Sequence, residues 1–218
     1  RAFKLYADGA LGSRGAYLLE PYADDLSTRG LQTLQKDDLR RVCALAKAHG
    51  FQVNVHAIGD AAVRMVLDVY EEFLVPGNDL RWRIEHAQIV HPDDIPRFGR
   101  LCVIPSIQTT HATSDMKWVQ QRLGSVRMSR AYPHRALLDQ NGWLPNGSDF
   151  PIEPIEPTRG FHSAVTRKND KGEPEGGFQP ENCFSREEAL KAMTLWAARA
   201  NFEETERGSL SVGKLADF

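Results

Sequence analysis

The chain has 218 residues, of which 41% are hydrophobic and 26% are charged, and its formal net charge at pH 7 is -2. This composition is typical of a globular protein, and it excludes the basic stripe of a nucleic-acid-binding surface and the long apolar run of a membrane span. The cysteines Cys43, Cys102 and Cys183 are too few and too scattered for a disulfide framework or a thiolate metal site. We therefore expect a cytoplasmic protein with no nucleic-acid or membrane partner.

Both ends of the sequence lie inside runs that resemble parts of larger elements. The chain opens on Arg1, without a methionine and within a strand-like run, and it closes partway into the apolar run at residues 213–218. We therefore expect a piece of a longer protein.

The first half of the chain alternates strand-like and helix-like segments. Residues 2–6 and 51–56 are short apolar runs typical of strands, whereas residues 34–49 place apolar side chains at helical spacing. Residues 61–74 repeat the helical spacing, and Asp60 is placed to cap that helix.

The second half continues the alternation. Further strands are expected at residues 82–86, 101–107 and 142–148. Helices are expected to begin at His91 and to span residues 116–123, 129–140, 158–166 and 185–200. The last helix opens with a capping-box pattern, Ser185 followed by Glu188 three positions later. Strands that alternate with helices predict a parallel sheet covered by helices, with about five of the eight strands of a closed β/α barrel.

Polar side chains gather at the carboxyl ends of the predicted strands. They are Lys4, Asp8, His56, His86, His111 and Asp149. In a parallel α/β fold these strand ends share one rim, where ligands and metals are held. Imidazole and carboxylate groups are ligands of divalent metals, and a water on such a metal loses a proton near neutral pH and attacks a carbonyl carbon. A nearby carboxylate can pass that proton to the leaving group, so the pattern points to metal-assisted hydrolysis.

Ordinary structural roles are the alternative for several of these residues. An isolated histidine at a strand end is more often structural than a ligand, and Lys4 is otherwise an ordinary rim lysine. Asp8 and Asp60 are also typical anchors of turns and helix starts. His111 follows a strand and faces the expected rim, so a contact with substrate is expected from its position.

Five segments spread in order over nearly the whole chain resemble signatures of the amidohydrolase superfamily. The closest branch is amidohydrolase family 3, whose members are metal-dependent amide hydrolases. The segments are residues 3–13 (FKLYADGALGS), 55–60 (VHAIGD), 83–88 (RIEHAQ), 147–151 (GSDFP) and 208–217 (GSLSVGKLAD). The resemblance implies a distorted β/α barrel beside a small β-sandwich that is formed from both chain ends.

The resemblance also implies roles for individual residues. His56 and His86 match the histidines of the fifth and sixth strands, which bind the second metal of a binuclear pair. Asp149 matches the aspartate of the eighth strand, which ligates the first metal and acts as general base. Lys4 stands where many members carry a lysine carboxylated by carbon dioxide, since a free ammonium has no lone pair with which to bridge two metals. The implied cofactor is one or two divalent ions, with zinc expected.

The sequence departs from the family pattern at its start. Members carry a His-X-His pair on the first barrel strand, which this sequence lacks, and Lys4 corresponds to the fourth strand. We therefore expect a partial (β/α)8 barrel, roughly strands four to eight with their helices, over residues 1–205. Residues 206–218 are expected to begin the return into the β-sandwich.

Two functions from different classes remain open. The first is hydrolysis of an amide or other non-peptide C–N bond of a small molecule, with His111 and Asp8 in contact with the substrate. The second is a non-catalytic remnant that folds or associates without a working metal site. An incomplete barrel leaves sheet edges unpaired, so we expect copies of the chain to associate through these edges.

Overall fold

Four parallel strands form one sheet in the computed structural model, which describes residues 2–216. In spatial order they are β1 (Ala2–Tyr6), β2 (Gln52–Ala57), β3 (Arg83–His86) and β4 (Ile104–Ser106). Every neighbouring pair is parallel, so each connection must cross over the sheet before the next strand begins. The predicted α/β fold with a parallel sheet is confirmed.

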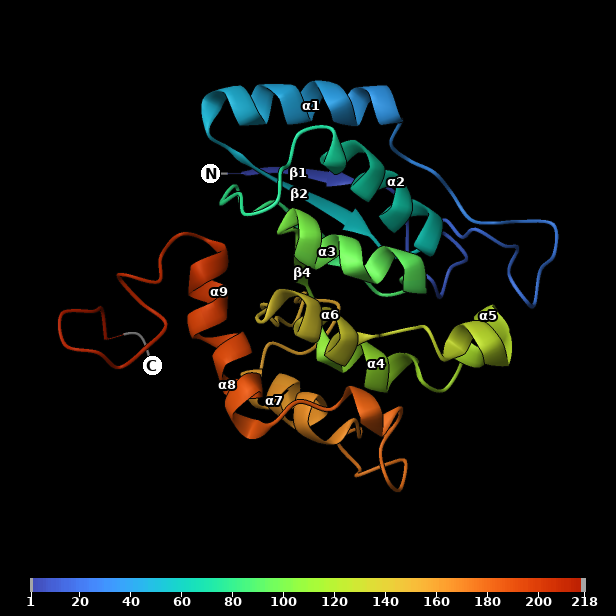
Figure 1. The fold of residues 1–218 in the computed structure, drawn as a ribbon. Coiled ribbons are helices and arrows are strands. Elements are labelled where there is room, and N and C mark those ends of the chain that lie inside the picture. Colours follow the sequence, from blue (N-terminus) through green and yellow to red (C-terminus); the bar gives the residue numbers. More distant parts are fainter. Residues whose placement is uncertain (1, 217–218) are drawn as a thin grey trace.

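Helices fill the connections between the strands and much of the chain after β4. The α-helices are α1 (Lys36–His49), α2 (Asp60–Glu71), α3 (Ile95–Leu101), α4 (Thr109–Asp115), α5 (Val119–Met128), α6 (His134–Asn141), α7 (Pro157–Thr166), α8 (Arg186–Met193) and α9 (Leu195–Ala200), and short 3-10 helices span Pro92–Asp94 and Pro180–Asn182. Figure 1 shows α1, α2 and α3 following one another across one side of the sheet. Helices in this arrangement form the outer layer of a β/α barrel wall.

The side of the sheet that faces these helices holds the main hydrophobic core. Val53, Val55 and Ala57 alternate along β2 and are fully buried. The hydroxyl of Tyr70 on α2 lies 3.0 Å from the backbone oxygens of both Val53 and Arg83, which links the helix to two strands. The intervening side chains of β2 are polar and point to the opposite face of the sheet.

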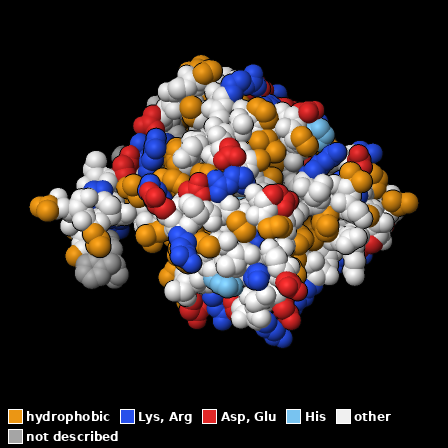
Figure 2. Space-filling model, turned by 60° about the horizontal axis from the view of Figure 1, so that its bottom comes forward, with side chains coloured by type: hydrophobic (Ala, Val, Ile, Leu, Met, Phe, Trp, Pro, Cys, Tyr) orange, Lys and Arg blue, Asp and Glu red, His pale blue; other side chains and the backbone are white. Residues whose placement is uncertain are grey.

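Ion pairs join the helices outside that core. Arg97 on α3 pairs with Asp68 and Glu71 on α2, at 3.0 and 2.9 Å, and Arg40 on α1 pairs with Glu72 at 2.8 Å. Figure 2 shows acidic and basic side chains lying side by side over much of the face that it presents. Exposed pairs of this kind each contribute only about 0–1 kcal/mol, so the apolar core remains the main source of stability.

The strand predicted at residues 142–148 is wrong. In this segment Asn146 alone makes a β-bridge, a parallel one to Ile107. Pro145 has no N–H to donate, and the N–H of Asn146 donates to the carbonyl oxygen of Ala192 at 3.0 Å instead of to a strand. The segment therefore passes beside the end of β4 without extending the sheet.

The helix predicted over residues 185–200 begins as expected and then breaks. The side chain of Ser185 accepts the N–H of Glu188 at 3.2 Å, and the Glu188 carboxylate accepts the N–H of Ser185 at 2.7 Å, which confirms the capping box. At Thr194 (φ -124°, ψ -91°) the helix divides into α8 and α9. The Thr194 hydroxyl donates to the carbonyl oxygen of Leu190 at 2.7 Å, a bond that often bends helices.

Other predicted boundaries are also corrected. The strand predicted over residues 101–107 is shorter, because Leu101 still belongs to α3 and Cys102 adopts a left-handed φ of 54°. The helices predicted over residues 116–123 and 129–140 are displaced to α5 and α6.

Asp60 does not cap α2 as predicted. The N-cap is Gly59, and the carboxylate of Asp60 accepts the N–H of Leu19 at 2.9 Å. The carbonyl oxygen of Tyr17 accepts two N–H groups from the first turn of α2, at 3.1 and 3.3 Å. The loop after β1 therefore satisfies the helix N-terminus that a side-chain cap would otherwise serve.

The last part of the chain is irregular. Residues 206–216 contain no helix or strand, and Asp217 and Phe218 lie outside the described residues. The division into a barrel part, 1–205, and a β-sandwich part, 206–218, therefore stays a prediction. Among residues 2–216, no helix is both long enough and apolar enough to cross a membrane.

The contact between the loop after β1 and the start of α2 yields a test of the fold. A Cβ added at Gly59 would lie 2.0 Å from the carbonyl oxygen of Tyr17, so Gly59→Ala must push the loop away from the helix. We expect Gly59→Ala to lower the free energy of unfolding by about 1–3 kcal/mol in urea titrations followed by circular dichroism.

The matched control for that test is Gly147→Ala, because a Cβ added at Gly147 meets nothing within 4 Å. Its effect should stay within about 0.5 kcal/mol. Equal stability of the two variants would contradict the tight approach of the loop to α2.

Candidate metal and active site

The carboxyl ends of β1, β2 and β3 place three side chains in one row. The parallel register pairs Tyr6 with His56 and His56 with Glu85. Side chains at paired positions lie on the same face of a sheet, and the rings of Tyr6 and His56 accordingly lie 5.3 Å apart. This face is the one opposite the helix-covered core.

His86 reaches the same place by an unusual backbone. It pairs with Ala57, whose side chain is buried in the core, so simple alternation would turn the imidazole away from His56. Instead His86 and Ala87 have left-handed φ angles of 76° and 42°, and the His86 ring lies 4.5 Å from that of His56. Left-handed backbone is uncommon for residues other than glycine and is concentrated at functional sites.

His111 completes a row of three imidazoles. It was expected in a polar loop after a strand, but it lies on α4, which begins at Thr109 with Gln108 as its N-cap. Its ring stacks on that of His86 with centroids 5.8 Å apart and planes 19° apart. The structure therefore brings together His56, His86 and His111 from three different elements.

Two of these imidazoles are neutral at physiological pH. Burial and the neighbouring His56 and His111 lower the pKa of His86 to about 3. Burial and His56 lower the pKa of His111 to about 4. A neutral imidazole keeps a lone pair on one nitrogen, which is the form that ligates metals.

Gln108, which the sequence analysis did not single out, fixes the proton on His86. The Oε1 atom of Gln108 lies 2.7 Å from Nδ1 of His86, while its Nε2 atom faces the carbonyl oxygen of Ser106 at 3.5 Å. An oxygen at this position requires a proton on Nδ1, which leaves the lone pair on Nε2. Metal-binding histidines generally donate their second nitrogen to such an acceptor. The only sequence signal for Gln108 was its place at the end of a strand.

The side chain of Asp8 is buried next to His56. Its carboxylate accepts the backbone N–H groups of Tyr17, Ile58 and Gly59 at 2.8–3.0 Å. One carboxylate oxygen also lies 3.4 Å from Nε2 of His56. Asp8 therefore holds the loop after β1 against the end of β2. This is the structural role, an anchor of a turn, that the sequence offered as the alternative to substrate binding. A direct contact of Asp8 with substrate stays a prediction.

Asp149 and Lys4 lie on the exposed side of the same rim. Desolvation raises the pKa of Asp149, while the charges of Lys4 and His56 lower it. Desolvation lowers the pKa of Lys4, and the carboxylates of Glu85 and Asp149 raise it. The ammonium of Lys4 lies 4.9 Å from the centre of the Tyr6 ring. Lys4 and Asp149 therefore influence each other, and the charge of His56 also acts on Asp149 while that of Lys4 acts on His86.

The donors present suit a nitrogen-ligated divalent ion, although the set is incomplete. Among residues 2–216, no three His, Cys, Asp or Glu side chains are close enough together to hold a metal ion. The Nε2 atom of His111 is nevertheless buried without a hydrogen-bond partner, which is unusual for a polar atom in a folded protein. Neutral imidazole nitrogens of this kind are the donors that zinc accepts. The roles of Lys4, His56, His86 and Asp149 as ligands stay predictions.

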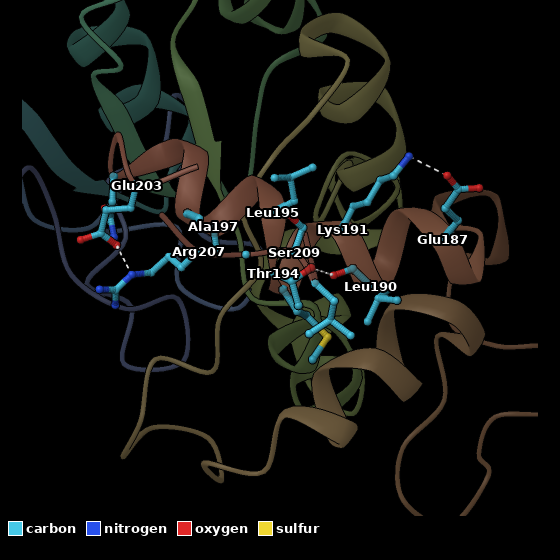
Figure 3. A pocket seen from close by; sticks show the side chains of 14 residues that line it. Glu187, Leu190, Lys191, Thr194, Leu195, Ala197, Glu203, Arg207 and Ser209 are labelled. Carbon is cyan, nitrogen blue, oxygen red and sulfur yellow. Dashed lines mark hydrogen bonds and ion pairs between the residues drawn. The ribbon is translucent and has the colours of Figure 1, made fainter. Parts of the chain in front are cut away.

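Two cavities of the protein lie away from this rim. A groove of about 720 Å³ runs between α8, α9 and the segment that follows them, and Figure 3 shows Leu190, Thr194 and Leu195 among the side chains that line it. A smaller cavity of about 240 Å³ is lined by residues that precede β3 and β4, such as Arg81 and Cys102. Neither cavity includes a rim histidine, and His86 and His111 are themselves buried.

Comparison with known proteins identifies relatives over the whole chain. Residues 1–218 match the amidohydrolase family. The chain is 38% identical over 217 residues to YtcJ of Bacillus subtilis, and this match covers 100% of the chain and 41% of YtcJ. It is 39% identical over 218 residues to Protein LONG AFTER FAR-RED 3 of Arabidopsis thaliana, covering 99% of the chain and 37% of that protein.

A solved structure has the same fold. The crystal structure of an uncharacterized metal-dependent hydrolase from Pyrococcus furiosus matches with a TM-score of 0.83 and 36% identity, covering 98% of this chain and 42% of the other. The chain thus spans about two fifths of the length of the proteins that it matches. This coverage confirms the expected partial β/α barrel.

The contact between Gln108 and His86 can be tested without any metal. Nitrogen-15 NMR of the imidazoles should place the His86 proton on Nδ1 in the unaltered chain and in Gln108→Glu, which keeps an acceptor. Gln108→Leu removes the acceptor, so the proton should move to Nε2. A proton on Nε2 in the unaltered chain would contradict the hydrogen-bond assignment.

Proposed function

Because this chain belongs to the amidohydrolase family, we propose that it provides the fifth- and sixth-strand side of the active site of a metal-dependent hydrolase. The reaction is hydrolysis of an amide or other non-peptide C–N bond of a small molecule. The observation that carries this proposal is the row of three imidazoles at the strand ends, in which His86 and His111 are neutral and Nε2 of His111 has no partner.

His56 and His86 would hold a divalent ion, for which we propose zinc. When bound, such an ion lowers the pKa of a coordinated water toward neutrality and polarises the carbonyl of the substrate. Gln108 keeps the lone pair of His86 on Nε2, and a carboxylate oxygen of Asp8 lies 3.4 Å from Nε2 of His56. His111 is stacked on His86 and its Nε2 atom has no partner, so we propose that an N–H at this position donates to the carbonyl oxygen of the substrate.

Asp149 is the proposed general base. It takes a proton from the attacking water and returns it to the nitrogen of the leaving group, so the C–N bond breaks without expelling an unstable amide anion. Desolvation raises the pKa of Asp149, which makes the carboxylate a better proton acceptor than a solvated one. Its exposed position leaves space for a substrate in front of it.

Lys4 is the proposed site of carboxylation. The neutral amine would add to the carbon of carbon dioxide and release a proton to the solvent, which would give a carbamate whose oxygens could serve as metal ligands. Desolvation lowers the pKa of Lys4 and so increases the fraction of neutral amine available for this reaction.

Cys43, Cys102 and Cys183 are all unpaired, which supports the cytoplasmic location that we propose.

Zinc binding is the decisive test of this function. Elemental analysis after dialysis against zinc should find stoichiometric metal on the purified chain, and His56→Ala or His86→Ala should remove most of it, since each takes away a ligand. His49→Ala is the matched control, because His49 is exposed at the end of α1 and far from any proposed role. No bound zinc at saturating concentration would instead favour a non-catalytic remnant.

We also propose that copies of the chain associate through β1. Among the described strands β1 lies at the edge of the sheet, and its Phe3 and Tyr6 side chains are 41% and 59% exposed. An open edge presents unpaired backbone groups and readily pairs with another strand.

Light scattering coupled to gel filtration should therefore find a dimer or larger species. Phe3→Lys places a charge on the edge and should shift the population toward monomer. A strictly monomeric unaltered chain at every concentration would contradict the association.

A further inference from the structure

A buried hydrogen-bonded bridge joins α4 to the segment that follows β3. The hydroxyl of Tyr132 donates to the carboxylate of Asp115 at 2.6 Å. The side-chain amide of Gln88 donates to the Tyr132 oxygen at 2.8 Å and faces the same carboxylate oxygen at 3.2 Å. The backbone N–H of Tyr132 also donates to the carbonyl oxygen of Gln88 at 2.6 Å. Tyr132 and Gln88 are buried, so these groups depend on each other rather than on water.

The bridge connects the segments that carry His86 and His111. Gln88 follows His86 by two residues, and Asp115 ends α4 four residues after His111, which is one turn along the same face of the helix. The other end of α4 is fixed separately, since Thr109 bonds to Asn146. His111 therefore stands between two anchors of a short helix.

We propose that Gln88, Tyr132 and Asp115 are positioning residues that hold His111 stacked on His86. This inference rests on the proposed function, in which His111 contacts the substrate and His86 holds the metal. The sequence analysis gave none of the three residues a role. The stacking of the imidazoles, with planes 19° apart, is the arrangement that the bridge maintains.

The charge of Asp115 makes the bridge sensitive to pH. Burial raises the pKa of this carboxyl to about 6, an effect that the hydrogen bond from Tyr132 opposes and the nearby Glu153 carboxylate reinforces. Above pH 6 the carboxylate accepts from both Tyr132 and Gln88. Below pH 6 the added proton reduces its capacity to accept, and the bridge should loosen. His86 and His111 titrate near 3 and 4, so they stay neutral across this range, and His56 is the other titratable group whose charge acts on both rings.

The metal-free chain gives a direct test by NMR of its carbon-13-labelled histidines. The ring protons of His111, assigned with His111→Gln, should be displaced by the ring current of His86. Tyr132→Phe removes the hydroxyl at the centre of the bridge and should return these signals toward the values of an unstacked imidazole. Unchanged His111 signals in folded Tyr132→Phe would overturn the proposal.

Tyr22→Phe is the matched control for that substitution. Tyr22 is also fully buried, and its hydroxyl makes a single hydrogen bond to the carbonyl oxygen of Ala16 at 2.8 Å. The control should lose comparable stability while leaving the His111 signals in place. If Tyr22→Phe shifted the His111 signals as much as Tyr132→Phe does, the bridge would have only a general structural role, and the proposal would be overturned.

A pH titration separates the charge of Asp115 from its packing. In the unaltered chain the His111 signals should move with a midpoint near pH 6. Asp115→Asn keeps an oxygen that accepts from Tyr132, so stacking should survive while the midpoint disappears. The same midpoint in Asp115→Asn would overturn the assignment. Because no metal is present, these outcomes do not depend on whether the chain binds zinc.

Discussion

The parallel register of β1, β2 and β3 is the constraint on which the site depends. Tyr6, His56 and Glu85 are far apart in the sequence, yet hydrogen bonding between strands places them at one level of the sheet. Parallel strands need long crossovers, and α1 and α2 supply these while burying the apolar side of β2. Fold stability and the placement of the polar rim residues therefore arise from the same alternation, in which one side of each strand is apolar and the other polar.

Asp8 connects this sheet to its loops. A carboxylate that accepts three backbone N–H groups contributes charge-assisted hydrogen bonds, each typically about 1.5–3 kcal/mol. These bonds hold the loop after β1 against the turn after His56, and the carbonyl oxygen of Tyr17 in that loop then satisfies the first turn of α2. The position of His56 is thus determined by its strand and by a loop from the preceding unit. Two successive β/α units therefore both contribute to the position of the rim residues.

The sequence predicted those parts of the site that depend on local patterns. Apolar runs located β1, β2 and β3, and the histidines at the ends of β2 and β3 were recognisable from position alone. It could not predict the left-handed backbone of His86, because alternation would turn that side chain into the core. It also missed α4, whose polar residues carry no apolar stripe, and so placed His111 in a loop. The false strand near Asn146 makes a single bridge to Ile107 and no ladder, because Pro145 has no N–H and the N–H of Asn146 donates to Ala192 on α8.

The rim has two unequal sides, and the difference follows from burial. His86 and His111 are enclosed, neutral and held by Gln108 and by the bridge at Asp115, so they are pre-organised before any ligand arrives. Lys4 and Asp149 are only partly desolvated and remain exposed, so water competes there with other partners. Charges in such a setting interact weakly, because the surrounding dielectric is high. Under the proposed function, covering the exposed side of the rim would strengthen the pairing of Lys4 and Asp149 with a metal far more than it would change the histidines. If the proposed function holds, catalytic competence should therefore depend on whatever shields these two residues from water.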